Sequence, residues 1–220
     1  MIVDINSQSL EEMVFSRLEE EILDGSLQRG DSLGEIALSK RLGVSRTPIR
    51  GALHRLSEEG LVDIAPNKGA KVVGINKEDL IDIYKIRERL EGLASALAAK
   101  RINEDALAKL RETVEIAEFY ISKNDTEHLK ELDTVFHKEI YKASGSRFLE
   151  HTLSELHKKI KLYRKRSLSV PGRLEKSLLE HKEILDAISL GNSELADKLT
   201  SIHVRSALEN MLEAFQDEQR

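Results

Sequence analysis

The stretch GVSRTPIRGAL, residues 43–53, decides the first part of the fold. Its Gly-Val turn is followed by Ser45, a residue type that favours the N-cap position of a helix. Pro48 fits the first turn of such a helix, where a missing N–H group costs little. The stretch therefore predicts a helix that begins after Ser45 and carries Arg46 and Arg50 one turn apart.

The flanking segments complete an ordered set of elements. Apolar residues at helical spacing predict a first helix from about residue 10 to an Asp-Gly stop at 24–25, and a short second helix over about 35–42. After the central helix, LVDIAPNKGAKVV at residues 61–73 predicts two short strands around a turn. Two helices, a turn, a helix and a hairpin form the order of a winged helix-turn-helix.

The central helix can present cations to a DNA groove. Its inward stripe is predicted to be Ile49, Ala52, Leu53 and Leu56. Arg46 and Arg50 lie beside that stripe with Thr47 on the outer face, and an arginine fork matches the acceptors of guanine. A helix N-terminus also favours phosphate, and Lys68 and Lys71 place positive charge on the hairpin. The alternative is an ordinary solvated basic face.

The residues LSKRLGVSRTPIRGALHRLSEEGLVDIAPNKGAKV (38–72) resemble the DNA-binding domain of the GntR family of bacterial transcription regulators. The resemblance implies a homodimer that binds a short pseudo-palindromic operator in double-stranded DNA. It also implies that Arg46 and Arg50 touch bases and that Gly69 at the wing tip approaches the minor groove. Gly51 stands where the family usually has Glu, and Ile36 stands where some members of the long-helix subgroup carry a third base-contacting Arg, so operator sequence cannot be taken over from relatives.

The whole composition restricts the class of protein. The 220 residues carry a formal net charge of -5 and no cysteine, which excludes disulfides and thiolate metal sites. We find no signal peptide at the N-terminus, and no stretch approaches the roughly 18 apolar residues of a membrane span. The sequence therefore predicts a cytoplasmic protein with no membrane partner.

The uneven distribution of glycine divides the chain into two parts. Residues 1–74 hold eight of the twelve glycines, and residues 75–220 hold four. We expect a mostly α protein: a winged helix-turn-helix over 1–74 and an all-α helical bundle over 75–220, which the resemblance given below implies to be antiparallel and to serve effector binding and dimerisation. The bundle helices are predicted at about 78–101, 104–123, 125–144, 146–166, 174–190 and 192–217.

Polar side chains interrupt the apolar stripes of three bundle helices. In LKELDTVFHKEIY (129–141), Asp133 and His137 fall four apart within the inward face. His181 and His203 intrude in the same way on two later helices. A lone inward histidine is commonly a hydrogen-bonded core residue, and Asp133 with His137 can be a local pair. Convergence of all four would instead supply N/O ligands for Zn²⁺, Ni²⁺, Co²⁺ or Mn²⁺.

A second resemblance covers residues 79–215. YKIRERLEGLASALAA (84–99), LDTVFHKEIYKASG (132–145), EHKEILDAI (180–188) and HVRSAL (203–208) resemble the FCD effector-binding domain of the FadR-like GntR subgroup. In its metal-containing branch an Asp-x3-His pair and two further histidines bind a divalent cation, and Asp133, His137, His181 and His203 match these positions.

The same resemblance implies that small carboxylic acids bind beside the metal with arginines completing the pocket. Arg87 is the leading candidate, and its alternative role is a helix-surface ion pair with Glu91. The basic run KKIKLYRKR (158–166) is expected to be the solvated face of a bundle helix, although some of its cations could line the effector cavity.

These features predict a metabolite-responsive transcription regulator rather than an enzyme. Three alternatives stay open at this stage: a metal-dependent hydrolase-like enzyme, a pure metal sensor, and a bundle whose histidines only form hydrogen bonds. The sequence offers no obvious general base beside the four candidate ligands, which disfavours the enzyme.

Overall fold

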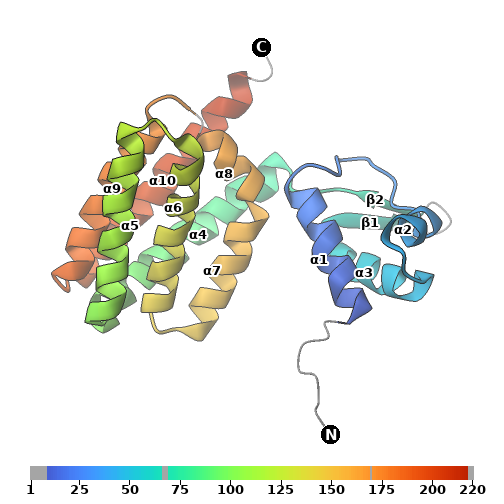
Figure 1. The fold of residues 1–220 in the computed structure, drawn as a ribbon, viewed down its shortest axis with the longest axis horizontal. Coiled ribbons are helices and arrows are strands. Elements are labelled where there is room, and N and C mark those ends of the chain that lie inside the picture. Colours follow the sequence, from blue (N-terminus) through green and yellow to red (C-terminus); the bar gives the residue numbers. More distant parts are fainter. Residues whose placement is uncertain (1–8, 66–68, 169, 218–220) are drawn as a thin grey trace, which may run out of the picture. The chain divides into compact units, whose positions relative to one another are not determined.

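The structure is a computed structural model that describes residues 9–65, 69–168 and 170–217 (Figure 1). The chain divides into two compact units, Met1–Lys77 and Glu78–Arg220. The helical classes predicted for both parts are confirmed: a helix-turn-helix with a two-stranded sheet, then a set of helices. None of the helices within the described ranges is long and apolar enough to cross a membrane.

The N-terminal unit has the predicted winged helix-turn-helix order. Its elements are α1 (Leu10–Leu23), α2 (Glu35–Leu42), α3 (Arg46–Glu58), β1 (Val62–Ala65) and β2 (Gly69–Val72). Gly43 ends α2 in the left-handed region (φ 69°) that glycine adopts without a Cβ clash, and its N–H donates to the Ser39 carbonyl over 3.0 Å. This turn sets α3 at an angle to α2.

One apolar core holds this unit together. The stripe predicted for α3 is buried, and it packs against α1, where Leu18 is fully buried. The strands pair antiparallel with Val62 opposite Val72. The Leu33 N–H donates to the Ala70 carbonyl over 2.8 Å, which ties the segment between α1 and α2 to the hairpin.

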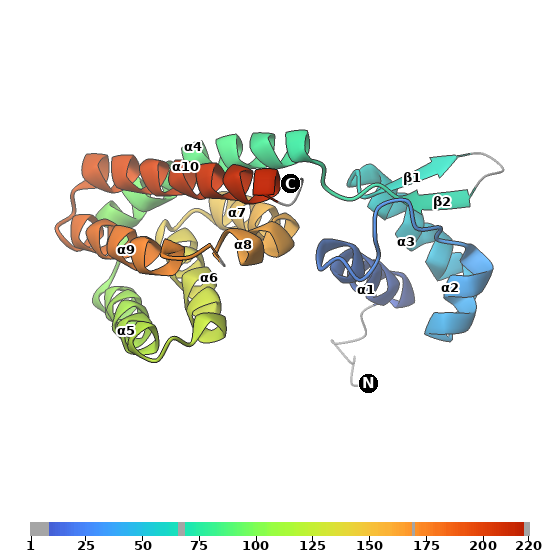
Figure 2. The same ribbon diagram turned by 90° about the horizontal axis from the view of Figure 1, so that it is seen from above.

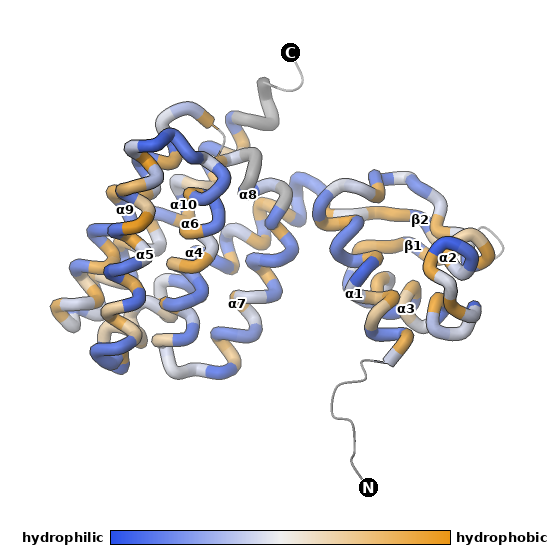
Figure 3. Tube along the Cα trace, in the orientation of Figure 1, coloured by the Kyte–Doolittle hydropathy of each residue, from blue (hydrophilic) through white to orange (hydrophobic). Residues whose placement is uncertain are grey.

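The C-terminal unit is helical throughout its described elements. They are α4 (Lys77–Arg101), α5 (Glu104–Ser122), α6 (Thr126–Ala143), α7 (Arg147–Lys159), α8 (Lys161–Ser167), α9 (Arg173–Ser189) and α10 (Ser193–Asp217). Helix α5 packs against α6 and α9, and α9 packs against α10. Figure 2 shows α4 beside α10, where the Thr200 hydroxyl donates to the Ser95 hydroxyl over 2.8 Å. Hydrophilic and hydrophobic residues alternate along the helices, as expected for helices with one buried face (Figure 3).

One helical boundary differs from the prediction. The single helix expected over 146–166 is two helices, because the chain leaves helical geometry at Ile160 (φ -100°, ψ 8°). No glycine or proline marks this position. Ile160 is fully buried, so tertiary packing rather than local propensity accounts for the break. The break starts a new helix, α8, whose side chains reach the interior of the bundle.

Candidate functional site

The first turns of α3 present two arginines and a threonine outward. Thr47 is exposed, and the side chains of Arg46 and Arg50 keep 57% and 58% of their exposure. Both guanidiniums bind one carboxylate oxygen of Glu35 on α2, at 2.8 Å from Arg46 Nη2 and 3.0 Å from Arg50 Nη2. Hydrogen bonds from Arg50 and Arg46 lower the pKa of Glu35 to about 2. The two arginines are therefore held side by side on the surface of this unit.

Two other arginines of this region have a structural role instead. Arg41 Nη2 lies 2.7 Å from Glu21 Oε2, and Arg55 Nη1 lies 2.6 Å from Glu12 Oε2. The Arg55 guanidinium also covers the Phe15 ring, 4.0 Å from its centroid. These contacts join α2 and α3 to α1. Arg41 and Arg55 therefore form ion pairs within the unit, and their charge is not free to contact DNA as the sequence suggested.

The other residues singled out in the N-terminal unit are one serine, one lysine and two glycines. Ser45 occupies the N-cap of α3 as predicted, although its side chain accepts no capping hydrogen bond. Gly69 is exposed with φ 78° and has open space where a Cβ would stand. Lys68 lies outside the described residues. At Gly51 a Cβ would meet the carboxylate of Glu11 on α1, which is the flexible end of a side chain and would have to move aside.

Four polar side chains from three helices meet inside the C-terminal unit. They are Asp133 and His137 from α6, His181 from α9 and His203 from α10. Each offers one ligand atom, these atoms all lie within 4.8 Å of one another, and all four residues are buried. The structure therefore brings together the complete set that the sequence singled out.

Carboxylates outside the cluster fix two of the imidazole rings. His137 Nδ1 lies 2.9 Å from Glu91 Oε2, and His203 Nδ1 lies 2.6 Å from Glu180 Oε2. His203 Nδ1 donates to Glu180, and the negative charge of Glu91 beside His137 Nδ1 favours a hydrogen on that nitrogen, so each Nε2 presents a lone pair. This is the outer-shell arrangement that orients metal-binding histidines in proteins.

The two Nε2 atoms face each other. His203 Nε2 and His137 Nε2 are 3.2 Å apart, and two lone pairs at this separation repel unless a proton or cation lies between them. Two nitrogens bound at about 2.1 Å to one ion lie roughly 3.0–3.4 Å apart at octahedral to tetrahedral angles. The observed separation fits that range, and the donor set fits a divalent cation.

The other two members complete the cluster. His181 Nε2 lies 3.5 Å from Asp133 Oδ1 and has no hydrogen-bond partner among the described residues. Burial holds the pKa of His181 well below its usual value, so the ring is neutral and able to act as a ligand. Burial raises the pKa of Asp133, but the charge of Arg164 together with the surrounding imidazoles lowers it well below its ordinary value. The carboxylate is therefore ionised.

Arg87 is buried beside this cluster rather than on a helix surface. Its Nε donates to Glu91 Oε1 over 2.7 Å, so the ion pair considered from the sequence exists, but both side chains are almost fully buried. Arg87 Nη1 has no hydrogen-bond partner in the described part of the chain. Glu91 joins Arg87 to His137 and is thus shared between a cation and a candidate ligand.

Several residues at this site were missed by the sequence reasoning. Arg164 belongs to the basic run 158–166, yet it is buried and its Nη2 binds Asp133 Oδ2. His157 is also buried, with its Nδ1 3.3 Å from Arg164 Nη1. Glu180 immediately precedes His181, but nothing in the sequence indicates that it faces inward.

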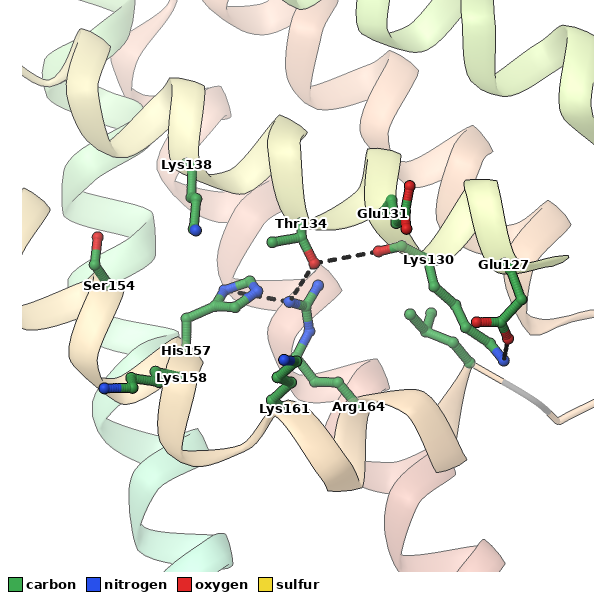
Figure 4. Close-up of a pocket in the computed structure, with 11 residues that line it drawn as sticks. Glu127, Lys130, Glu131, Thr134, Lys138, Ser154, His157, Lys158, Lys161 and Arg164 are labelled. Carbon is green, nitrogen blue, oxygen red and sulfur yellow. Dashed lines mark hydrogen bonds and ion pairs between the residues drawn. The ribbon is translucent and has the colours of Figure 1, made fainter. Parts of the chain in front are cut away.

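Three cavities lie at or beside the cluster, and one of about 20 Å³ is lined by Asp133 and His181. An inner one of about 20 Å³ is lined by Arg87, His137 and His203 among others. An outer one of about 490 Å³ lies between α6, α7 and α8 (Figure 4). Arg164 and Leu168 line the inner and outer cavities and separate them.

Comparison with known proteins identifies both units. Residues 10–72 match the family of bacterial regulatory proteins called gntR, and residues 82–206 match the FCD domain. The Bacillus subtilis (strain 168) protein "Uncharacterized HTH-type transcriptional regulator YdhC" is 30% identical over 90% of this chain and 88% of its own. The Escherichia coli (strain K12) "HTH-type transcriptional regulator McbR" is 32% identical over 67% of each chain.

Solved structures agree with this. The E. coli McbR/YncC structure superposes with a TM-score of 0.72 at 25% identity, over 96% of this chain and all of the other. A GntR regulator from Rhodococcus sp. RHA1 gives a TM-score of 0.69 at 24% identity, over 94% of this chain and 99% of its own. Because the relatives are named transcriptional regulators, the enzyme alternative is set aside. The chain belongs to the GntR family of DNA-binding transcription regulators and carries an FCD domain at its C-terminal side.

Proposed function

We propose that this regulator responds to a metabolite, and that its FCD domain belongs to the metal-binding FadR-like branch. Asp133, His137, His181 and His203 would hold a divalent cation, with Zn²⁺, Ni²⁺, Co²⁺ and Mn²⁺ as the candidates. The observation that carries this proposal is the facing pair of Nε2 atoms, 3.2 Å apart, on two rings whose Nδ1 atoms are committed to carboxylates.

The effector is a small carboxylic acid. When bound, the cation supplies a fixed positive charge that attracts a carboxylate. Arg87 is the residue we assign to a second oxygen of the acid, because its buried Nη1 has no hydrogen-bond partner in the described residues and it lines the same inner cavity as His137. An arginine adds direction to a charge contact through its paired N–H donors.

The DNA-binding unit acts as one half of a homodimer on a pseudo-palindromic operator in the bacterial cytoplasm. Arg46, Thr47 and Arg50 reach the major groove from the exposed side of α3. Lys68 and Gly69 belong to the wing and meet the adjacent phosphates and minor groove. Glu35 occupies Nε and Nη2 of both arginines, so a base contact made through these groups requires Glu35 to release them, whereas Nη1 of each arginine can reach DNA without this change.

The two DNA-binding units of the dimer can adopt two arrangements. The effector changes the affinity for the operator only if it binds the protein more tightly in one of these arrangements than in the other. A coupling of about 1–3 kcal/mol, or roughly 5- to 150-fold in DNA affinity, is the usual range for such regulators.

A pure metal sensor is the second candidate. It is favoured by the size of the inner cavity, which at about 20 Å³ holds no more than a water molecule in this conformation. In that case the cation itself would be the signal and no acid would enter beside it.

One titration separates the two candidates. A DNA fragment is first selected from a random pool by the protein, and its affinity is then measured by fluorescence anisotropy. The metal-free protein, the metal-loaded protein and the metal-loaded protein with a panel of small carboxylic acids are compared. We expect a change of about 5- to 150-fold only when an acid is present. A full change with metal alone supports the sensor, and no change in any state contradicts both candidates. His181→Ala, which removes one ligand, is the control.

A further inference from the structure

The outer cavity between α6, α7 and α8 has the properties of a binding site in its own right. We propose that it binds an organic anion with two acid groups, and that Arg164 couples its occupancy to the cluster of Asp133, His137, His181 and His203. The coupling rests on the metal site proposed above; the anion site does not.

Positive charge predominates in the lining of this cavity. Its cations are Lys130, Lys138, Lys158, Lys161 and Arg164, and its carboxylates are Glu127 and Glu131. Lys130 is neutralised by Glu127, 2.9 Å away. Lys138 and Lys161 are exposed and form no ion pair with any residue that the structure describes. Figure 4 shows Lys138 and Lys161 on opposite sides of the His157 and Arg164 side chains. Two separated cations without counter-charges favour a ligand with two separated negative groups.

His157 adds a buried donor to the same wall. Arg164 can only donate hydrogen bonds, so its Nη1 contact at 3.3 Å makes His157 Nδ1 an acceptor and leaves the hydrogen on Nε2. That Nε2 is buried and has no hydrogen-bond partner among the described residues. A buried N–H group without an acceptor is costly, and an acid oxygen at the inner end of the cavity would satisfy it.

The volume sets the size of the ligand. About 490 Å³ lies within the range of small-molecule sites in proteins. A dicarboxylic acid or sugar diacid of four to six carbons leaves room for water inside it, whereas the inner cavity of about 20 Å³ has no room for one in this conformation. The outer cavity is therefore large enough to take up a whole metabolite as the structure stands.

A continuous set of contacts leads from this cavity to the cluster. His157 Nδ1 contacts Arg164 Nη1, and Arg164 Nη2 binds Asp133 Oδ2, while Asp133 Oδ1 faces His181. An anion beside His157 attracts Arg164 and changes its hold on the Asp133 carboxylate. Occupancy of the outer cavity thus changes the affinity of the cluster for a cation, and by linkage the reverse also holds.

Calorimetric titrations of the full-length protein test the anion site. Succinate, adipate and glucarate are titrated into metal-stripped and metal-loaded protein at low ionic strength, with acetate as the monoanion. We expect at least one dianion to bind about tenfold tighter than acetate, and Lys138→Ala with Lys161→Ala to weaken it about tenfold or more. The matched control is Lys109→Ala with Lys142→Ala, which removes the same charge from a different cavity beside α5 and α6 and should leave the affinity unchanged.

The outcomes separate this inference from the proposed function. If none of the three dianions binds, or if both double variants weaken binding equally, the anion site does not exist. In a second outcome, the dianion loses its binding in His181→Ala and keeps it in the double variant of Lys138→Ala with Lys161→Ala. That result places the anion at the metal alone. It overturns this inference and leaves the proposed function standing. Dianion binding to the metal-stripped protein supports the anion site, and only a protein that takes up none of the candidate metals when they are supplied removes the metal from the proposed function.

The coupling has its own readout. The dissociation constant of the cation, measured with and without the bound dianion, should change by about threefold or more in the natural protein and by less in Arg164→Lys, which shortens the link. An unchanged constant in the natural protein overturns the coupling.

Discussion

Glu91→Gln tests the outer shell of the proposed metal centre. Glu91 accepts a hydrogen bond from Arg87 Nε over 2.7 Å and lies 2.9 Å from His137 Nδ1, and its side chain is 1% exposed. Glutamine keeps the shape but removes the charge, and its amide N–H₂ would face the Nδ1–H of His137. To avoid two facing donors, the His137 hydrogen moves to Nε2, which is the nitrogen directed at the cluster.

Glu91→Gln should lower both the metal affinity and the free energy of unfolding. Loss of an outer-shell partner costs a metal site about 10- to 100-fold in affinity. Removing one member of a buried ion pair leaves the charge of Arg87 uncompensated and costs about 3–5 kcal/mol of unfolding free energy. For a chain of this length that corresponds to a melting temperature lower by roughly 6–20 °C.

Two assays separate these two effects. Competition with a chromogenic chelator gives the metal affinity, and thermal unfolding of the metal-free protein gives the stability. Glu88→Gln is the matched control, since Glu88 lies on the same helix and its partner, Arg205, is exposed. A Glu91→Gln variant that binds metal as tightly as the natural protein would refute the tautomer argument, whatever its stability.

Three further predictions concern the rest of the chain. Arg50→Ala should lower specific DNA affinity about tenfold and leave metal and acid binding intact, because Arg50 is exposed on α3; unchanged operator preference in a mobility-shift assay would argue against it. Gly51→Ala should raise the free energy of unfolding by about 0.5–1 kcal/mol through helix propensity, because the Glu11 carboxylate near its Cβ is the flexible end of a side chain; a lower urea midpoint would show that Glu11 cannot move. Leu153→Ala should cost about 2–5 kcal/mol, since Leu153 is fully buried between α7 and its neighbours; a loss below about 1 kcal/mol in urea unfolding would mean that the site collapses around the change.

The elements with strong local signals could be predicted from the sequence. Helix α2 is found at Glu35–Leu42, as its apolar spacing and terminal glycine indicate. The hairpin follows from alternation around a turn. Asp133 and His137 were recognisable because a polar residue on an apolar stripe is conspicuous, and the same holds for His181 and His203.

The partners of those residues could not be predicted. Glu91, Glu180 and Arg164 occupy positions that look like ordinary surface charges, because a helix in this sequence carries charges on several faces. Only the packing of α4, α8 and α9 decides which of these charges turn inward. The break at Ile160 has the same origin, since it is fixed by burial of that side chain rather than by a local stop signal.

The charge of the DNA-binding unit illustrates a further limit. Sequence counting treats Arg41, Arg46, Arg50 and Arg55 alike. In the structure Arg41 and Arg55 are bound to acids of α1, whereas Arg46 and Arg50 share Glu35 at the surface. A count of basic residues therefore overestimates the charge available for DNA.

The central claim is that three imidazoles and one carboxylate hold an ion within the FCD domain. Elemental analysis of the protein, purified without chelators and dialysed against each candidate metal in turn, tests it most directly. We expect close to one divalent ion per chain in the natural protein and little or none in His181→Ala. A natural protein that retains no stoichiometric ion from any of the four metals, or a variant that retains as much as the natural protein, would contradict it.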